Sequence, residues 1–197
     1  MRTIRCSARL AAPCIAATLA LACESPTTPA NAGLDRASVS TDMLPIASAN
    51  GGGHYLLQGT IDVQFAFGAV QQPSGEVAGQ FHQTLIFQGE LLDFDGTVTC
   101  LAFDPATNHA WIGGVITSNR STHPYYMQDL FQPGHDVWFR VVDYGEGATA
   151  AQPDRTTFLG FEDNPTIKSS AQYCAEKPWP EGDARTWPVT EGNIQVR

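Results

Sequence analysis

Hydrophobic and polar residues alternate with a period of two along most of the chain beyond residue 50. The clearest case is IDVQFAF at residues 61–67, where odd positions are large and apolar and even positions are polar or small. This alternation is typical of a β-strand with one buried face. Four further stretches repeat it, through the apolar sets Val77, Phe81 and Leu85; Leu92, Phe94, Val98 and Cys100; Ala110, Ile112 and Ile116; and Val137, Phe139 and Val141. Shorter strands are predicted at 155–161 and 193–196, and residues 54–58 open the set.

Turn residues separate these stretches: QPSG at 72–75, DPATN at 104–108 and GEG at 145–147. The best helical candidate, residues 124–131, has a poor period. About eight short strands joined mostly by hairpins predict an all-β domain. An antiparallel up-and-down β-barrel is favoured because closing the sheet removes its edges, and a two-sheet β-sandwich is the alternative.

Two long loops interrupt the hairpin pattern. Residues 119–135 are rich in histidine and aromatic residues, and residues 163–188 carry Cys174, Trp179 and Trp187. Loops of this length are usually functional or held by a cross-link.

The apolar residues divide between two faces of the predicted sheet. The inner face carries bulky rings that predict a filled barrel: Phe65, Phe67, Phe81, Phe94 and Phe139. The opposite face carries Trp111, Trp138, Val115, Leu101 and Phe103. We expect the two long loops to cover it with Tyr125, Tyr126, Phe131, Trp179 and Trp187. A second small core is favoured there over a platform that stacks carbohydrate.

The N-terminus has the pattern of an export signal. Residues 1–9 contain three arginines and no acid, and residues 10–22 are apolar but too few to span a bilayer. Residues 20–23, ALAC, resemble the lipobox of bacterial lipoproteins, although the −3 and −2 positions depart from it. Cleavage at the Ala-x-Ala sequence of residues 30–32 is the alternative, but that site lies well beyond the apolar run.

These features predict a signal peptide at 1–22, lipid attachment at Cys23, a flexible Ser/Thr/Pro/Ala tether at 23–50 and a β-domain at 51–197. The expected location is the bacterial cell envelope, as a membrane-anchored lipoprotein. A secreted soluble protein is the alternative.

The charge balance narrows the partners. The chain has 11 basic and 20 acidic residues, a net charge of −9, and loss of the signal's three arginines would bring it to −12. A surface this acidic repels nucleic acid and anionic lipid. Contact with the membrane is therefore expected through the lipid anchor only.

Cysteine positions also favour export. Cys6 and Cys14 lie in the signal, and Cys23 would carry lipid. The remaining two, Cys100 and Cys174, are predicted to form a disulfide in an oxidising compartment. The cysteines do not have the CxxC spacing that would indicate a metal site.

No motif marks catalytic, cofactor-binding or metal-binding residues, and no cofactor is expected. The five histidines show no metal-ligand spacing and are interpreted as surface residues: His54, His82, His109, His123 and His135. Convergence of His123 and His135 across the aromatic loop stays open. Asp93 and Asp95 share a strand face where Ca²⁺ would find oxygen ligands, but a solvated strand face is favoured. The sequence has no GxSxG elbow and no phosphate-binding loop.

Several short motifs together resemble a group of exported bacterial β-domains of unknown function. They are NGGGH at 50–54, GQF at 79–81, GTVTCL at 96–101, AWIGGVIT at 110–117 and FRVVDYGEG at 139–147, followed by Asp154 and Arg155. The resemblance implies a β-rich extracytoplasmic domain and transfers no catalytic residue.

The favoured interpretation is therefore a lipid-anchored envelope β-domain that acts as a non-enzymatic structural or partner-binding module, with a protein or glycan partner at the cell surface. A lipocalin-like barrel that carries a small apolar ligand is the first alternative. An envelope hydrolase or isomerase is the second.

Overall fold

The structure is a computed structural model that describes residues 46–146, 150, 152–181 and 184–197. The predicted signal peptide, Cys23 and most of the predicted tether lie outside the described residues. The first strand begins at Ala47, so the last four residues assigned to the tether belong to the folded domain. Within the described ranges, no helix has the length and apolar character needed to cross a membrane.

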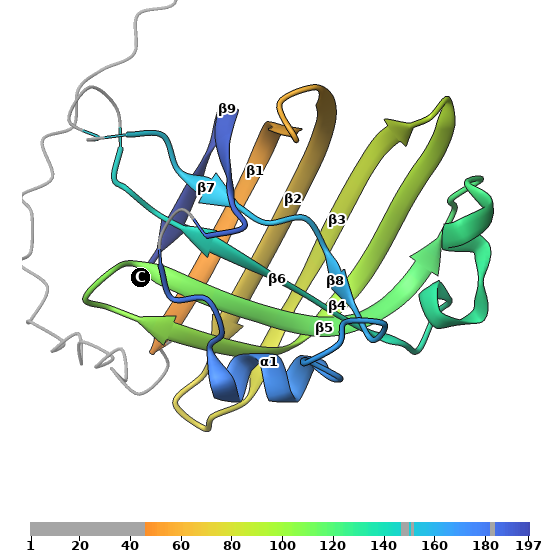
Figure 1. The fold of residues 1–197 in the computed structure, drawn as a ribbon. Helices are drawn as coiled ribbons and strands as arrows, with labels where there is room; N and C mark the ends of the chain where they lie inside the picture. Colours follow the sequence, from red (N-terminus) through yellow and green to blue (C-terminus); the bar gives the residue numbers. More distant parts are fainter. Residues whose placement is uncertain (1–45, 147–149, 151, 182–183) are drawn as a thin grey trace, which may run out of the picture. The chain divides into compact units, whose positions relative to one another are not determined.

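Nine strands make up the described sheet. They are β1 (Ala47–Leu57), β2 (Ile61–Gln71), β3 (Val77–Phe87), β4 (Glu90–Asp104), β5 (His109–Asn119), β6 (Asp136–Val142), β7 (Arg155–Thr156), β8 (Gly160–Phe161) and β9 (Trp187–Val196). From β1 to β6 each strand pairs antiparallel with the next, β6 pairs with β7 and β8, and β9 pairs with both β7 and β1. The sheet closes into an up-and-down barrel of eight strand positions (Figure 1), which confirms the predicted fold.

The seventh strand position is broken. The sequence predicted one strand at 155–161, but only its two ends pair with β6, as β7 and β8. β9 continues the barrel through just two pairs, Arg155 with Pro188 and Thr156 with Trp187. Past these two pairs, the two segments no longer pair with each other. We call this junction between residues 155–161 and β9 the seam.

Aromatic rings fill the barrel, as the inner-face pattern predicted. Phe67 and Phe81 both make edge contacts with Phe139, with ring centroids 5.3 and 5.9 Å apart. Gln83 is a buried polar residue among these rings, and its amide donates to the Tyr55 hydroxyl at 3.0 Å. A cavity bordered by the same rings measures about 10 Å³, room for about one water molecule.

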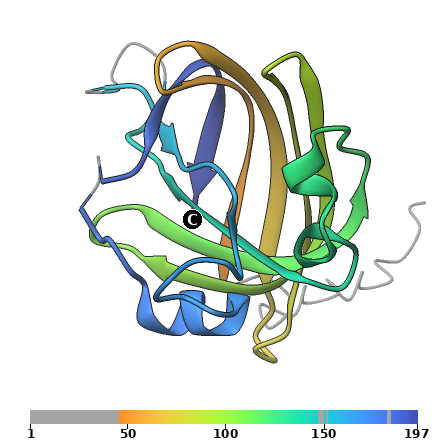
Figure 2. The same ribbon diagram turned by 45° about the vertical axis from the view of Figure 1, so that its right-hand side comes forward.

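The loop after β5 forms two short 3₁₀ helices, η2 (Pro124–Met127) and η3 (Asp129–Phe131). Figure 2 brings them forward. Tyr126 and Phe131 pack against Phe94 and Phe161 of the main core. The expectation that this loop covers the opposite sheet face is therefore wrong, because its rings extend the barrel core instead.

A β-bulge at Thr99 reverses the faces of β4. Val98 pairs with Gly114 and Cys100 pairs with Gly113, so Thr99 is one extra residue. Leu101 is buried in the main core and Phe103 packs against it, while Cys100 points outward. The predictions that Cys100 shares the inner face, and that Leu101 and Phe103 lie opposite, are wrong because the period of two was carried through the bulge.

Helix α1 (Ser170–Glu176) lies against the outer face of β4 and β5, inside the segment predicted as a long loop (Figure 1). The Ser169 hydroxyl caps its N-terminus by accepting from the Gln172 amide at 3.1 Å. Cys174 of α1 and Cys100 are joined at disulfide distance, 2.00 Å. Gly113 permits this approach, since a Cβ there would lie 2.7 Å from the Cys100 sulfur.

The outer face of β5 and β6 carries the predicted second core. Trp111 and Trp138 pack with Ile167 and Tyr173, and Trp179 borders them. Of the other rings expected as cover, Trp187 packs on the main core and Tyr125 is 44% exposed.

Candidate functional site

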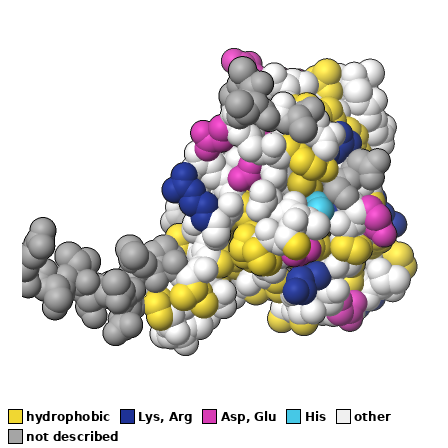
Figure 3. Space-filling model, turned by 90° about the vertical axis from the view of Figure 1, so that its left-hand side faces the viewer, with side chains coloured by type: hydrophobic (Ala, Val, Ile, Leu, Met, Phe, Trp, Pro, Cys, Tyr) yellow, Lys and Arg dark blue, Asp and Glu magenta, His cyan; other side chains and the backbone are white. Residues whose placement is uncertain are grey.

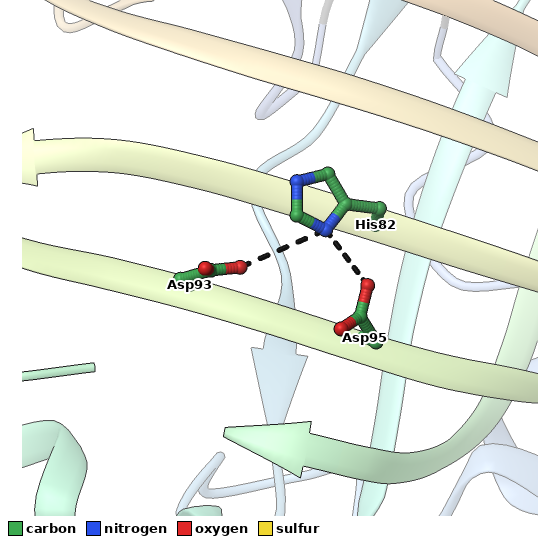
Figure 4. A group of neighbouring side chains, drawn as sticks. All are labelled: His82, Asp93 and Asp95. Carbon is green, nitrogen blue, oxygen red and sulfur yellow. Dashed lines mark hydrogen bonds and ion pairs between the residues drawn. The ribbon is translucent and has the colours of Figure 1, made fainter. Parts of the chain in front are cut away.

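A charged cluster lies on the outer face of β3 and β4. His82 pairs in register with Asp95, and its Nδ1 lies 2.8 Å from that carboxylate and 3.6 Å from Asp93 (Figure 4). Asp93 and Asp95 thus share a face, as their spacing predicted. Within the described residues, one ligand atom from each of the three lies within 4.8 Å of the others, as a metal ion requires.

Arg120, just past β5, already supplies the positive charge of this cluster. Its Nε and Nη2 each donate to one oxygen of Asp93 at 2.9 Å, and its Nη1 donates to Asp95 at 2.6 Å. Burial pushes the pKa of Asp95 upward, but hydrogen bonds from Arg120 and His82 outweigh this and hold that pKa below its usual value. A divalent ion would have to displace the guanidinium, so the cluster fits a satisfied ion network.

Sequence reasoning missed Arg120. The pairing of Phe94 with Asn119 places it beside the two aspartates, but that register follows another irregularity, between Asp95 and Gly96. No local motif in the sequence reveals such a contact.

A groove of about 480 Å³ borders His82 and Asp95. Its lining combines two core rings, Phe67 and Phe81, with glycines, Ala66 and polar residues. Its exposed surface is about evenly polar and apolar, and it lacks the tryptophans that line the aromatic cleft at the seam.

The other histidines serve separate contacts. His54 lies 3.1 Å from Asp62, and His135 lies 3.2 Å from Glu162. His123 packs against Phe87 and Tyr126 instead of joining His135 in a common site.

His109 is not a surface residue, contrary to the sequence interpretation. It is 3% exposed, and its ring packs against Trp111. Burial, helped by the nearby Arg140 charge, lowers its pKa. The error came from judging the position by its neighbouring turn, although β5 begins at this residue.

An aromatic cleft of about 290 Å³ opens at the seam. It lies where β9 stops pairing with the seventh strand position, between residues 157–164 on one side and Trp179, Arg185 and Trp187 on the other. Three of the chain's four tryptophans line it: Trp138, Trp179 and Trp187.

Stacked rings build the cleft walls. Trp138 stacks on Tyr173 with centroids 5.8 Å apart, and Trp187 stacks on Tyr55 at 6.2 Å. Gly160 lies directly against the Trp138 ring, so any side chain at that position would collide with the indole. Packing against Tyr173, Tyr55 and Gly160 therefore fixes the positions of these rings. Trp187 is half-buried and borders both the main core and the cleft.

The cleft rim contains an arginine stacked on a tryptophan. The guanidinium carbon of Arg185 lies 4.1 Å from the Trp179 ring centroid. Both residues have left-handed backbones, with φ of 57° and 54°, and so does Lys177. Non-glycine residues rarely adopt this conformation, and its clustering is more typical of functional segments than of plain connections.

Two further arginines donate hydrogen bonds to the segment that carries this rim, at Ala184 and Thr186. Arg155 donates from Nε to the Thr186 hydroxyl at 2.7 Å and from Nη2 to the Thr186 carbonyl at 2.8 Å. Arg140 is 1% exposed, and its Nη2 donates to the Ala184 carbonyl. Its Nη1 and His109 Nε2 are the two buried side-chain polar atoms in the described ranges that have no hydrogen-bond partner.

The charge of Glu181 acts on Arg140 from beyond ion-pair distance. Among the described residues, no carboxylate lies within 4.0 Å of the guanidinium nitrogens of Arg140, Arg155 or Arg185. Burial lowers the pKa of Arg140, because a charge held away from water is less favourable.

The opposite wall adds polar groups. Asn164 accepts from the amides of Thr166 and Ile167 through its side-chain oxygen. Asp163 accepts from the Tyr125 hydroxyl at 2.6 Å, and this hydrogen bond raises the pKa of Tyr125 to about 12.

Sequence reasoning named Trp138, Trp179 and Trp187 only as members or covers of a second core. It missed Arg140 and Arg185, for which the sequence carries no signal beyond their nearness to aromatic residues. Comparison with known proteins adds no constraint: no family model, curated protein or solved structure matches the chain.

Proposed function

We propose that this protein is an exported binding module, anchored by lipid at Cys23 to the bacterial cell envelope, and that the aromatic cleft at the seam takes its partner. The N-terminal pattern supports export, and the Cys100–Cys174 pair is consistent with an oxidising compartment. The observation that carries the proposal is the placement of three of four tryptophans around an open cleft, on a barrel whose interior is filled.

The filled interior favours this cleft over a carrier site within the barrel. An apolar ligand would have to occupy the space now taken by Phe67, Phe81 and Phe139. The cavity that these rings border holds only about 10 Å³, whereas ligand sites usually enclose several hundred.

The cleft chemistry favours binding over hydrolysis or isomerisation. An acid–base catalyst needs a titratable group whose pKa is shifted toward neutrality beside the substrate. The acid at the cleft, Asp163, is exposed and accepts a hydrogen bond from Tyr125, and the ionised form of Asp95 in the other cluster is favoured by Arg120. Acidic and basic side chains are interspersed on the face shown in Figure 3, which suits a soluble binding domain.

Two measurements test the proposal. Mass spectrometry of the mature chain from membranes is expected to find an N-terminal Cys23 with attached acyl chains, and Cys23→Ala is expected to release the protein from the membrane fraction. Co-sedimentation with isolated envelope fragments is then compared for the wild type, Trp179→Ala and the control Ile86→Ala. Ile86 is 60% exposed on β3 and does not line the cleft.

Binding that is lost with Trp179→Ala and kept with Ile86→Ala supports the cleft. Equal sedimentation of all three proteins, with urea unfolding showing each one folded, contradicts it. A mature N-terminus at Gly33, after the Ala-x-Ala sequence, contradicts the lipid anchor.

A further inference from the structure

The aromatic cleft combines ring faces with one arginine, Arg185, and one carboxylate, Asp163, which already accepts a hydrogen bond from the Tyr125 hydroxyl. We infer that its ligand is an anionic saccharide: a sugar ring that carries a carboxylate or phosphate, stacked on the tryptophans with its anion at Arg185. This inference rests on the proposed function, since it names the ligand class of the same cleft.

The ring faces argue for a sugar. A pyranose presents a flat face of C–H groups that stacks on an indole, and a rim of hydroxyls that needs donors and acceptors. Trp179 and Trp187 are half-buried at the cleft, and Asn164 and Thr157 line it with polar groups. The volume of about 290 Å³ is adequate for one or two rings.

The charge argues for an anion. The chain has a net charge of −9, yet Arg185 stands on the cleft rim with Arg140 and Arg155 behind it. Arg140 is almost fully buried, and its Nη1 has no hydrogen-bond partner in the described structure. It interacts electrostatically with Tyr173 of the cleft wall. Field from a buried cation is poorly screened, so it favours a negative group nearby.

Arginine is also the side chain best shaped for this role. Its planar guanidinium donates two parallel hydrogen bonds to a carboxylate or phosphate. The guanidinium carbon of Arg185 lies 4.1 Å from the centroid of the Trp179 ring, and its N–H groups are the donors that would meet a ligand anion. The same residue then contributes both charge and orientation.

An extended peptide fits the cleft less well. Strand addition needs a continuous free edge whose backbone groups pair with the new strand. The edge at the seam consists of the two residues of β8 and an interruption at 157–159, where the Leu159 amide already reaches Gln83.

Tryptophan fluorescence of the full chain, purified from membranes in a neutral detergent, tests the inference. The probes are trigalacturonic acid, its methyl ester, which has the same rings without charge, and inorganic phosphate. We expect trigalacturonic acid to change the emission and to bind at least tenfold more tightly than the ester. Phosphate is expected to compete only weakly, because it lacks the ring.

Variants locate the effect. Arg185→Gln is expected to abolish the preference for the acid over the ester, and Trp179→Ala to weaken both. Arg197→Gln is the matched control, since Arg197 is exposed at the C-terminus and bonds only Gln195 and backbone groups in the described structure. Equal affinity for acid and ester, or an unchanged preference in Arg185→Gln, overturns the anionic ligand.

The remaining outcomes separate the two proposals. If phosphate competes as strongly as the trisaccharide binds, the site recognises an anion only and the saccharide is wrong. If no probe binds but envelope sedimentation still depends on Trp179, the saccharide class is wrong and the binding module stands. If a phosphorylated trisaccharide binds more tightly than trigalacturonic acid, with the same dependence on Arg185, the anionic saccharide stands and its anion is phosphate.

Discussion

Two charged regions on the outer wall of the same barrel differ in how their charges are balanced. Between β3 and β4, Arg120 donates to both Asp93 and Asp95, and His82 completes the set. On β6, Arg140 is buried and its guanidinium reaches only a backbone carbonyl. The first region is balanced by direct ion pairs, whereas Arg140 in the second region feels the charge of Glu181 without forming an ion pair with any described carboxylate.

The difference has an energetic meaning. Arg120 is half-exposed, so water screens its charge and would screen it even without the aspartates. A buried guanidinium without a carboxylate costs several kcal/mol in desolvation, which other interactions of the fold must offset. The cluster around Arg120 is therefore balanced by its own ion pairs, whereas the fold has to offset the cost of burying Arg140.

The largest expected effect on stability comes from removing the disulfide that ties α1 to the outer face of the barrel, near Arg140. The double variant Cys100→Ala/Cys174→Ala is expected to lose about 2–4 kcal/mol of unfolding free energy, because the disulfide closes a long loop and ties α1 to the barrel. Urea unfolding measures the loss. Tryptophan emission is expected to shift to the red, while the titration of Asp95 stays as in the wild type. A loss below about 1 kcal/mol would show that packing alone holds α1.

The next effect has the opposite sign. Arg140→Met keeps a similar shape but removes the buried charge, so we expect about 1–2 kcal/mol of stabilisation despite the lost hydrogen bond to Ala184. The control Arg197→Met, on the exposed C-terminus, should change stability by less than about 0.5 kcal/mol. Marked destabilisation by Arg140→Met would mean that nearby negative charge stabilises the guanidinium, and Glu181→Gln would then test the contribution of that carboxylate.

The comparison also shows what the sequence reveals. Period-two alternation and turn residues predicted an all-β domain of hairpin-linked strands with a filled interior, because each strand has one buried face. They favoured the barrel that the structure shows, but left a two-sheet sandwich open. They failed at Thr99, where one extra residue exchanged the faces of Cys100 and Leu101. They also failed at 155–161, where the alternation continues but the strand is interrupted at residues 157–159.

The candidate site was harder to predict than the fold. The tryptophans were visible in the sequence, but the cleft arises because β9 leaves the seventh strand position after Thr156 and Trp187. The charges of Arg120 and Arg140 look alike in the sequence. Only the three-dimensional structure shows that Arg120 contacts two carboxylates, whereas Arg140 contacts none among the residues that the structure describes.

A smaller effect on stability is expected from a change in the other charged region, the cluster around Arg120. Arg120→Gln is expected to destabilise the protein several times less than loss of the disulfide, because its ion pairs are exposed. The difference from the wild type should shrink in 1 M NaCl, where surface charges are screened. Urea unfolding at low and high salt measures it. A salt-independent loss would mean that Arg120 acts by packing rather than by charge.

The smallest effect is the pH dependence of that same cluster. The folded-state pKa of Asp95 is lowered, so its ionised form contributes stability that is present above the unfolded value of about 4 and is lost as pH falls through the folded value. The stability difference between wild type and Arg120→Gln should therefore narrow from pH 5 to pH 3.

Asp154 provides an internal reference of opposite sign. It is buried and its pKa is raised by desolvation, so its contribution is present at low pH and is lost as pH rises through the folded value. NMR titration is expected to show that Arg120→Gln raises the pKa of Asp95 and leaves that of Asp154 unchanged. If both move together, the variant has altered the barrel as a whole. If Asp95 does not move, Arg120 does not balance it, and the contrast with Arg140 disappears.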